Sequence, residues 1–141
     1  VDHLHMLVSA VHEGDERRAI DSIMTRLRSL VEETGAGIIL VSHLRRVDGN
    51  KGHENGIEVS LSHLRGSNSI GQLSDCVIAL ERNQQSDDPD EAWNTRLRLL
   101  TSRYTGDVGM AARVIYDAET GRLSELSNED IEFDNSGDEG F

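Results

Sequence analysis

Residues 15–43 read DERRAIDSIMTRLRSLVEETGAGIILVSH, and this stretch decides the fold class. Asp15 is suited to cap a helix, and the apolar residues after it recur at the spacing of one buried helix face: Ile20, Ile23, Met24, Leu27, Leu30 and Val31. Gly35 predicts the end of that helix. The next residues, GIILVS (37–42), form a continuous apolar run, which is typical of a strand covered on both faces.

The opening VDHLHMLVSA (1–10) mixes polar and apolar residues at strand-like spacing, so the order up to residue 42 is strand, helix, strand. That order predicts an α/β fold with a central, mostly parallel sheet and helices. Further on, residues 59–75 predict a short interrupted helix and CVIALER (76–82) predicts a strand. The sequence ARVIYDAETGRL (112–123) predicts a C-terminal hairpin.

The acidity of the chain is concentrated at its end. The formal net charge is −12, but seven of the 26 acidic residues lie in the last 17 positions, which hold no Lys or Arg. The remainder has 19 acidic against 14 basic residues, so a local basic DNA-binding surface is not excluded. We expect a folded part at residues 1–125 and a disordered acidic tail at 126–141 that ends in Phe141.

Cysteine content and hydropathy argue against three classes of protein: disulfide-rich, cysteine-zinc and membrane-spanning. The only cysteine, Cys76, lies in an apolar run and is predicted to be buried, which leaves no disulfide framework and no zinc site built from cysteines. The sequence contains no apolar run of 18 residues and no cleavable signal. We therefore expect a cytoplasmic protein without a membrane partner.

Two polar side chains stand near the carboxyl ends of the expected strands, where open α/β sheets bind ligands. Asp2 suits a magnesium ion held through water and phosphate, and His43 is placed to respond to the charge of a terminal phosphate. Each also has an ordinary structural interpretation, as an exposed aspartate and a hydrogen-bonded histidine. The histidines at 3, 5, 43, 53 and 63 match no metal-ligand spacing.

A basic, glycine-containing loop follows His43. Arg45, Arg46 and Lys51 allow phosphate contact without reading bases, so the loop suits a sequence-independent grip on DNA. A solvated surface loop is the alternative.

Three further side chains suit nucleotide contacts. Arg103 precedes a glycine-containing loop and is placed to reach a phosphate, or else forms a surface salt bridge. Arg82 and Tyr116 are suited to stack a planar base between guanidinium and ring, or else are ordinary strand residues. The chain has only five Phe, Tyr and Trp residues, which argues against an aromatic single-strand-binding platform.

Five segments, in this order and spacing, resemble the ring-shaped, DnaB-like helicases with a RecA-like core: VDHLHMLVSA, DERRAIDSIMTRLRSL, ILVSHLR, LRGSNSIGQLSDCVIALERNQQ and SRYTGDVG. The similarity covers nearly the whole chain. It is greatest to the helicase half of primase-helicases of the phage T-seven type, with mitochondrial Twinkle more distant. It implies a hexameric replicative DNA helicase that couples hydrolysis of an NTP (dTTP or ATP) with Mg²⁺ to translocation on single-stranded DNA and duplex unwinding.

The resemblance also implies roles for individual residues. Asp2 matches the Walker B aspartate that helps hold magnesium, and His43 matches the histidine that senses the terminal phosphate. Gln72 matches a switch-helix glutamine that couples the nucleotide and DNA sites. Arg103 matches an arginine finger that acts in the neighbouring subunit's nucleotide site.

Further roles follow from the same match. Arg82 and Tyr116 match a pair that sandwiches the nucleotide base. The loop at residues 44–56 matches a central-channel loop that grips single-stranded DNA. The acidic tail resembles a segment that docks on the replicative DNA polymerase, with Phe141 as its anchor.

One departure limits what the chain is expected to do alone. It contains no G-x-x-x-x-G-K-[ST] phosphate loop, which we expect upstream of Val1 in a parent chain, so this chain alone is not expected to hydrolyse nucleotide. The alternative is a non-catalytic RecA-fold module that binds DNA or docks on a polymerase.

Overall fold

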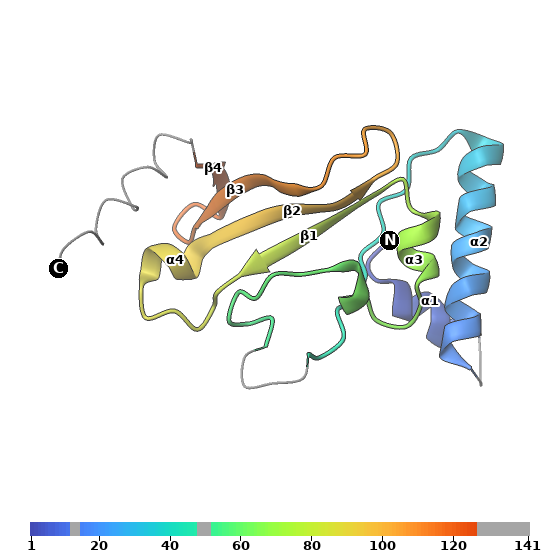
Figure 1. The fold of residues 1–141 in the computed structure, drawn as a ribbon, viewed down its shortest axis with the longest axis horizontal. Coiled ribbons are helices and arrows are strands. Elements are labelled where there is room, and N and C mark those ends of the chain that lie inside the picture. The colour runs from blue at the N-terminus through green and yellow to red at the C-terminus, as the bar shows by residue number, and fades with distance from the viewer. Residues whose placement is uncertain (12–14, 48–51, 127–141) are drawn as a thin grey trace.

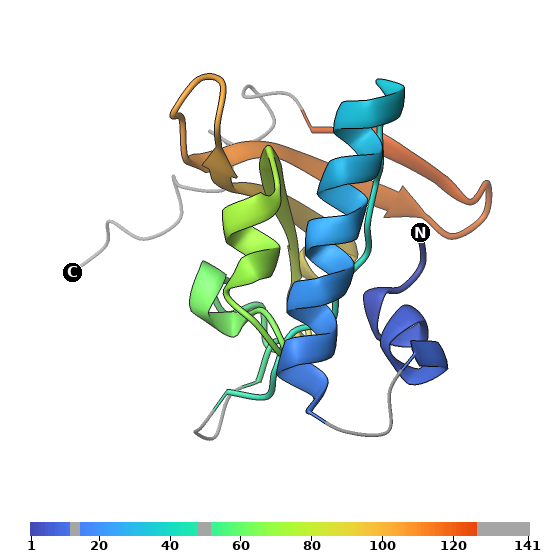
Figure 2. The ribbon, with the colours of Figure 1, turned by 90° about the vertical axis from the view of Figure 1, so that its right-hand side faces the viewer.

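The computed structural model describes residues 1–11, 15–47 and 52–126. In chain order its elements are α1 (Leu4–Val11), α2 (Glu16–Thr34), the 3₁₀ turn η1 (Leu61–His63), α3 (Ser69–Leu73), β1 (Cys76–Arg82), α4 (Pro89–Trp93), β2 (Asn94–Ser102), β3 (Gly109–Asp117) and β4 (Arg122–Glu125). Helices α1, α2 and α3 gather at one end of the strands, and α4 lies at the other end (Figure 1). Figure 2 shows α1 and α3 on either side of α2.

The predicted central helix is confirmed as α2, with both of its predicted end signals. The Asp15 side chain accepts a hydrogen bond from the backbone N–H of Arg17 at 3.0 Å. Gly35 adopts the left-handed conformation, with φ +67°, and its N–H donates to the Val31 carbonyl at 2.9 Å. The buried face of α2 packs on α1 and α3 and consists of Ala19, Ile20, Ile23 and Met24.

Replacing Gly35 by alanine is expected to lower the free energy of unfolding by about 1 kcal/mol, because a left-handed backbone disfavours a Cβ atom. Gly37→Ala is the matched control. A Cβ meets nothing within 4 Å at either glycine, but only Gly35 has a positive φ. Urea unfolding of both variants measures the difference, and equal losses would contradict a purely conformational cost.

The opening segment was predicted as a strand, and that prediction is wrong. Residues 4–11 form helix α1, because Leu4, Leu7 and Val8 have helical spacing and pack toward α2; Leu4 and Val8 are buried there. The alternating His-Leu-His-Met at its start imitates the period of a strand over too few residues to decide between them. His3 and His5 therefore lie before and within a helix.

Residues 37–42 are extended but belong to no assigned strand, so this strand prediction is not confirmed. Their backbone bonds to the chain start number three in the described part: the Val1 amino group donates to the Ile39 carbonyl at 2.6 Å, the Val41 N–H donates to the Val1 carbonyl at 2.9 Å, and the Leu4 N–H donates to the Val41 carbonyl at 2.9 Å. These bonds alternate as in a parallel pair. The pairing ends where α1 begins at Leu4.

The sheet has the order β1-β2-β3-β4 and is antiparallel throughout the described residues. The predicted mostly parallel sheet is therefore not confirmed, whereas β1 and the C-terminal hairpin are. The hairpin turns through Gly121, which has φ +69°. Its Asp117 carboxylate accepts hydrogen bonds from the N–H groups of Glu119 and Thr120 at 2.8 and 3.2 Å.

The core lies among α1, α2 and α3, and the sheet contributes little to it. In β1 only Ala79 and Glu81 are buried, whereas alternate residues on the other face are exposed: Cys76, Ile78 and Leu80. The predicted burial of Cys76 is thus wrong, because the two-residue period of the strand places it on the exposed face. In the part of the chain that the structure describes, no helix is long and apolar enough to span a bilayer.

Candidate functional site

Two of the predicted site residues, Arg103 and Gln72, are in contact. Arg103 follows β2, and its Nη2 donates to the Gln72 carbonyl at 2.6 Å. Its backbone N–H donates to the Asp75 carbonyl at 2.7 Å, and its Nε lies 3.7 Å from Asp75 Oδ1. The side chain remains 47% exposed. The guanidinium is thus fixed on one side by α3 and open to solvent on the other.

Asp75 links this site to α2. Both of its carboxylate oxygens accept from Arg28 Nη1, at 2.7 and 2.9 Å, and Arg28 Nε donates to Glu32 at 2.8 Å. The hydrogen bonds to Glu32 and then Asp75 raise the pKa of Arg28. Because Arg28 takes the close contact with Asp75, Arg103 has the longer one. Sequence reasoning assigned no role to Asp75, whose partner is 47 residues away.

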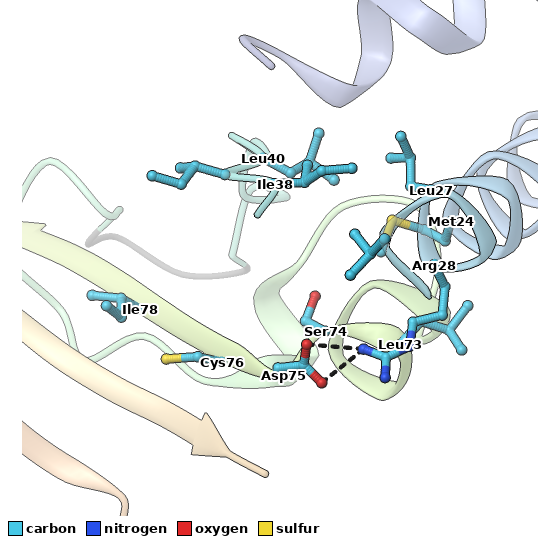
Figure 3. Close-up of a pocket in the computed structure, with 12 residues that line it drawn as sticks. Met24, Leu27, Arg28, Ile38, Leu40, Leu73, Ser74, Asp75, Cys76 and Ile78 are labelled. Atoms are coloured by element: carbon cyan, nitrogen blue, oxygen red, sulfur yellow. Dashed lines mark hydrogen bonds and ion pairs between the residues drawn. The ribbon is translucent and has the colours of Figure 1, made fainter. Parts of the chain in front are cut away.

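A cavity of about 450 Å³ lies beside this ion pair. Figure 3 shows Arg28, Ser74 and Asp75 on one side of it and apolar side chains of α2 and residues 38–40 on the other. Among the described residues, none of the predicted nucleotide or DNA residues lines it. The cavity adjoins the predicted site only through Asp75, which lines it and contacts Arg103.

The chain start brings His3 and His43 together. Their ring centroids are 4.2 Å apart in an edge-on arrangement, and His5 lies 6.0 Å from His43 and 6.1 Å from His3. Asp2 precedes His3 and is exposed, so its oxygens suit a hard cation that keeps most of its water and binds substrate phosphates. Over residues 1–11, 15–47 and 52–126, no group of three His, Cys, Asp or Glu side chains is arranged to hold a metal ion.

The pKa of His5, in this cluster, is lowered from the ordinary value of histidine. Burial of its ring lowers the pKa, the positive charge of Arg65 adds to this, and Glu16, 3.3 Å from His5 Nε2, opposes it. Burial likewise lowers the pKa of His63, with His53 as the second cause.

The free energy of unfolding is expected to fall as the pH drops below 6.5, the ordinary pKa of histidine. The folded pKa of His5 is below the unfolded one, so its contribution is complete above pH 6.5 and is lost as the pH falls through the folded pKa. His5→Gln removes this titration. Urea unfolding from about pH 7.5 to about pH 5.5 should give a flatter profile for the variant, and identical profiles would contradict the assignment.

Arg82, Trp93 and Tyr116 form an aromatic cluster at the far end of the sheet. The register Arg82↔Thr95↔Val114 places Arg82 and Tyr116 on the same face. Trp93 contacts both: the Arg82 guanidinium carbon lies 4.6 Å from the indole centroid, and the Trp93 and Tyr116 centroids are 5.5 Å apart. Sequence reasoning paired Arg82 with Tyr116 but missed Trp93, whose only signal was its being the sole tryptophan.

The first part of the predicted DNA loop is fixed to residues 63–65. The Arg45 N–H donates to the His63 carbonyl at 2.8 Å, and the Arg65 N–H donates to the His43 carbonyl at 3.1 Å. Arg45 Nε donates to the Ser62 carbonyl at 2.7 Å, which occupies part of its guanidinium. Arg46 is exposed. Lys51 and Phe141 lie outside the described residues.

The segment that directly follows the same loop is held by a buried carboxylate, Glu81, to which the sequence analysis gave no role. The Glu81 side chain is fully buried, and its Oε1 accepts from the Val59 N–H at 2.8 Å and from Arg98 Nε at 2.7 Å. Arg96 Nε lies 3.6 Å from Glu81 Oε2, and its Nη2 donates to the Gly56 carbonyl. Strands β1 and β2 thereby fix residues 56–59.

Comparison with known proteins identifies the fold and then the family. The structure is similar to a solved chain described as an ATPase domain, with a TM-score of 0.66 and 21% identity over 84% of this chain and 40% of that one. The predicted RecA-like class is thus confirmed. Residues 1–125 match the DnaB-like helicase C-terminal domain, and the chain belongs to that family, as predicted.

A relative of known description is the DNA helicase/primase of Enterobacteria phage T3. The two are 45% identical over 127 residues, which make up 90% of this chain and 22% of the relative. This agrees with the predicted similarity to phage primase-helicases. The chain thus spans about a fifth of that relative's length.

Proposed function

We propose that this chain is part of a hexameric replicative DNA helicase, in which NTP hydrolysis drives translocation on single-stranded DNA and duplex unwinding. The observation that carries the proposal is the pairing of residues 43–45 with residues 63–65. His43, the predicted phosphate sensor, and Arg45, at the start of the predicted DNA loop, belong to one hydrogen-bonded segment. A shift at the nucleotide is therefore transmitted directly to the DNA loop.

The remaining roles fit around this segment. Asp2 would hold Mg²⁺, which would supply positive charge to offset that of the nucleotide phosphates, and the nucleotide is dTTP or ATP. Arg103 acts on the phosphate in the neighbouring subunit, and its bond to the Gln72 carbonyl supports the coupling role of α3. An arginine that works across an interface requires a closed ring of subunits.

Two partners complete the proposal. Arg45, Arg46 and Lys51 grip the strand through its phosphates. The acidic tail that ends in Phe141 docks on the replicative DNA polymerase through a salt-sensitive contact. A phage protein of this kind acts in the cytoplasm of its host.

Arg46→Ala in the full protein that contains this chain is expected to weaken single-strand binding. Because single strands release about 0.7 counterion per neutralised phosphate, the slope of log affinity against log salt should fall by about 0.7 for each subunit whose Arg46 contacts the strand. Anisotropy titrations of a labelled oligonucleotide at several salt concentrations measure it. Arg26→Ala, which removes an exposed arginine of α2, is the control, and an unchanged slope for Arg46→Ala would remove this residue from the DNA contact.

The alternative is a non-catalytic RecA-fold module that binds DNA or docks on a polymerase. Both proposals predict the salt dependence, but only the motor predicts nucleotide hydrolysis stimulated by single strands. Hydrolysis by the full protein, measured with and without an oligonucleotide, separates them. DNA binding without hydrolysis would favour the module.

A further inference from the structure

Trp93 contacts both of the side chains between which the proposed function places a nucleotide base. Its indole contacts the Arg82 guanidinium at 4.6 Å and the Tyr116 ring at 5.5 Å with an interplanar angle of 32°. A flat base between two stacking partners needs about 7 Å, twice the contact distance of about 3.5 Å. Neither gap admits another ring while Trp93 stays in place.

Arg82 is engaged by the same element in a second way. Its Nε donates to the Ala92 carbonyl at 2.5 Å, next to the indole over which the guanidinium lies. Helix α4 therefore occupies both the hydrogen-bonding edge and one stacking face of Arg82. A base that stacks on Arg82 has to replace interactions that α4 now makes.

Helix α4 makes few buried contacts and can therefore move away from Arg82. None of its five residues is buried, and Trp93 itself is 37% exposed. Beyond the contacts with Arg82 and Tyr116, Glu91 ties α4 to the preceding loop by accepting hydrogen bonds from Asn83 at 3.0 Å and Ser86 at 2.5 Å. Local opening of an exposed helical turn with so few buried contacts needs less free energy than opening of the core.

We infer that Trp93 is an internal competitor for the base: it fills the space between Arg82 and Tyr116 without nucleotide and is displaced when the base binds. This rests on the proposed base-binding role of Arg82 and Tyr116. Trp93 thereby sets how tightly the base is bound and leaves the chemistry at the phosphates unchanged. Any base has to overcome the same stack, so the effect applies to all NTPs.

Trp93→Ala in the full protein is expected to lower KM for NTP about 3- to 10-fold with kcat unchanged, as removal of one competing aromatic pair implies. Trp93→Phe keeps a ring and should stay between the alanine variant and wild type. Asp90→Ala, in the same helix, is the control for damage to α4 and should leave KM unchanged. A higher or unchanged KM in Trp93→Ala would overturn the inference.

A spectroscopic measurement on the folded wild-type protein adds a second readout. The difference in emission between wild type and Trp93→Phe isolates Trp93. On NTP addition this emission should shift to the red, and its quenching by acrylamide should rise, with saturation near KM. No change at saturating NTP would overturn displacement.

The base-binding role itself is tested separately. Arg82→Ala and Tyr116→Ala should each raise KM for NTP. If neither does, the proposed base contacts are wrong. If both variants raise KM, but Trp93→Ala leaves KM unchanged and NTP does not change the emission of Trp93, only the role of Trp93 is wrong.

Discussion

Alanine at position 103 is expected to lower DNA-stimulated nucleotide hydrolysis of the full protein by about 10³- to 10⁵-fold, the effect of removing an arginine finger. A guanidinium in this position would stabilise the charge that develops on the transferring phosphoryl group. Arg103 is suited to this because it is held by the Gln72 carbonyl while 47% of its side chain is exposed. Steady-state hydrolysis with saturating single-stranded DNA measures the loss.

Two further variants delimit the role of Arg103. Arg103→Lys keeps the charge but not the planar fork, so most of the loss should remain. Arg122→Ala, which removes an exposed arginine of β4, should leave hydrolysis unchanged. Near-normal hydrolysis by Arg103→Ala would contradict the arginine-finger role and leave Arg103 only its surface ion pair with Asp75.

Glu81→Ala is expected to lower the free energy of unfolding by about 3–5 kcal/mol, because it leaves the charges of Arg96 and Arg98 without their buried partner. It also removes the acceptor of the Val59 N–H and so releases the segment that directly follows the predicted DNA loop. Urea unfolding measures the stability loss, and single-strand binding by the folded variant should weaken as well.

Glu58→Ala is the matched control for Glu81. Its carboxylate lies 3.3 Å from the same residue, Arg98, but its side chain is 72% exposed, so the expected loss is at most about 1 kcal/mol. Similar losses for the two variants would show that the burial of Glu81 is not the source of its effect.

Elements defined by local signals were predictable from the sequence. Helix α2 begins after Asp15 and ends before Gly35 as expected, because both capping interactions involve residues within one turn. The hairpin at Gly121 was predictable for the same reason. At the site, the family resemblance singled out Arg103 and Gln72 separately, and the hydrogen bond between them is an observation of the structure that the sequence did not predict.

Features that depend on distant partners were not predictable. The alternating residues at the chain start suggested a strand, but the buried faces of Leu4 and Val8 against α2 favour a helix. In the sequence, Glu81 is only a polar residue near the end of an apolar strand. Its partners, Arg98 and the Val59 N–H, come from distant segments that the fold brings to it. The contacts of Trp93 with Arg82 and Tyr116 could not be predicted, because they depend on where α4 packs against the sheet.

The central claim, that Arg103 completes the nucleotide site of a neighbouring subunit in a ring motor, is tested most directly by mixing. Arg103→Ala subunits are titrated into wild-type protein, and hydrolysis stimulated by single-stranded DNA is measured at each ratio. The account predicts that a minority of variant subunits depresses hydrolysis by more than their share. A decrease in simple proportion to the variant fraction would contradict a coordinated ring, and an absence of hydrolysis in the wild type would contradict the motor itself.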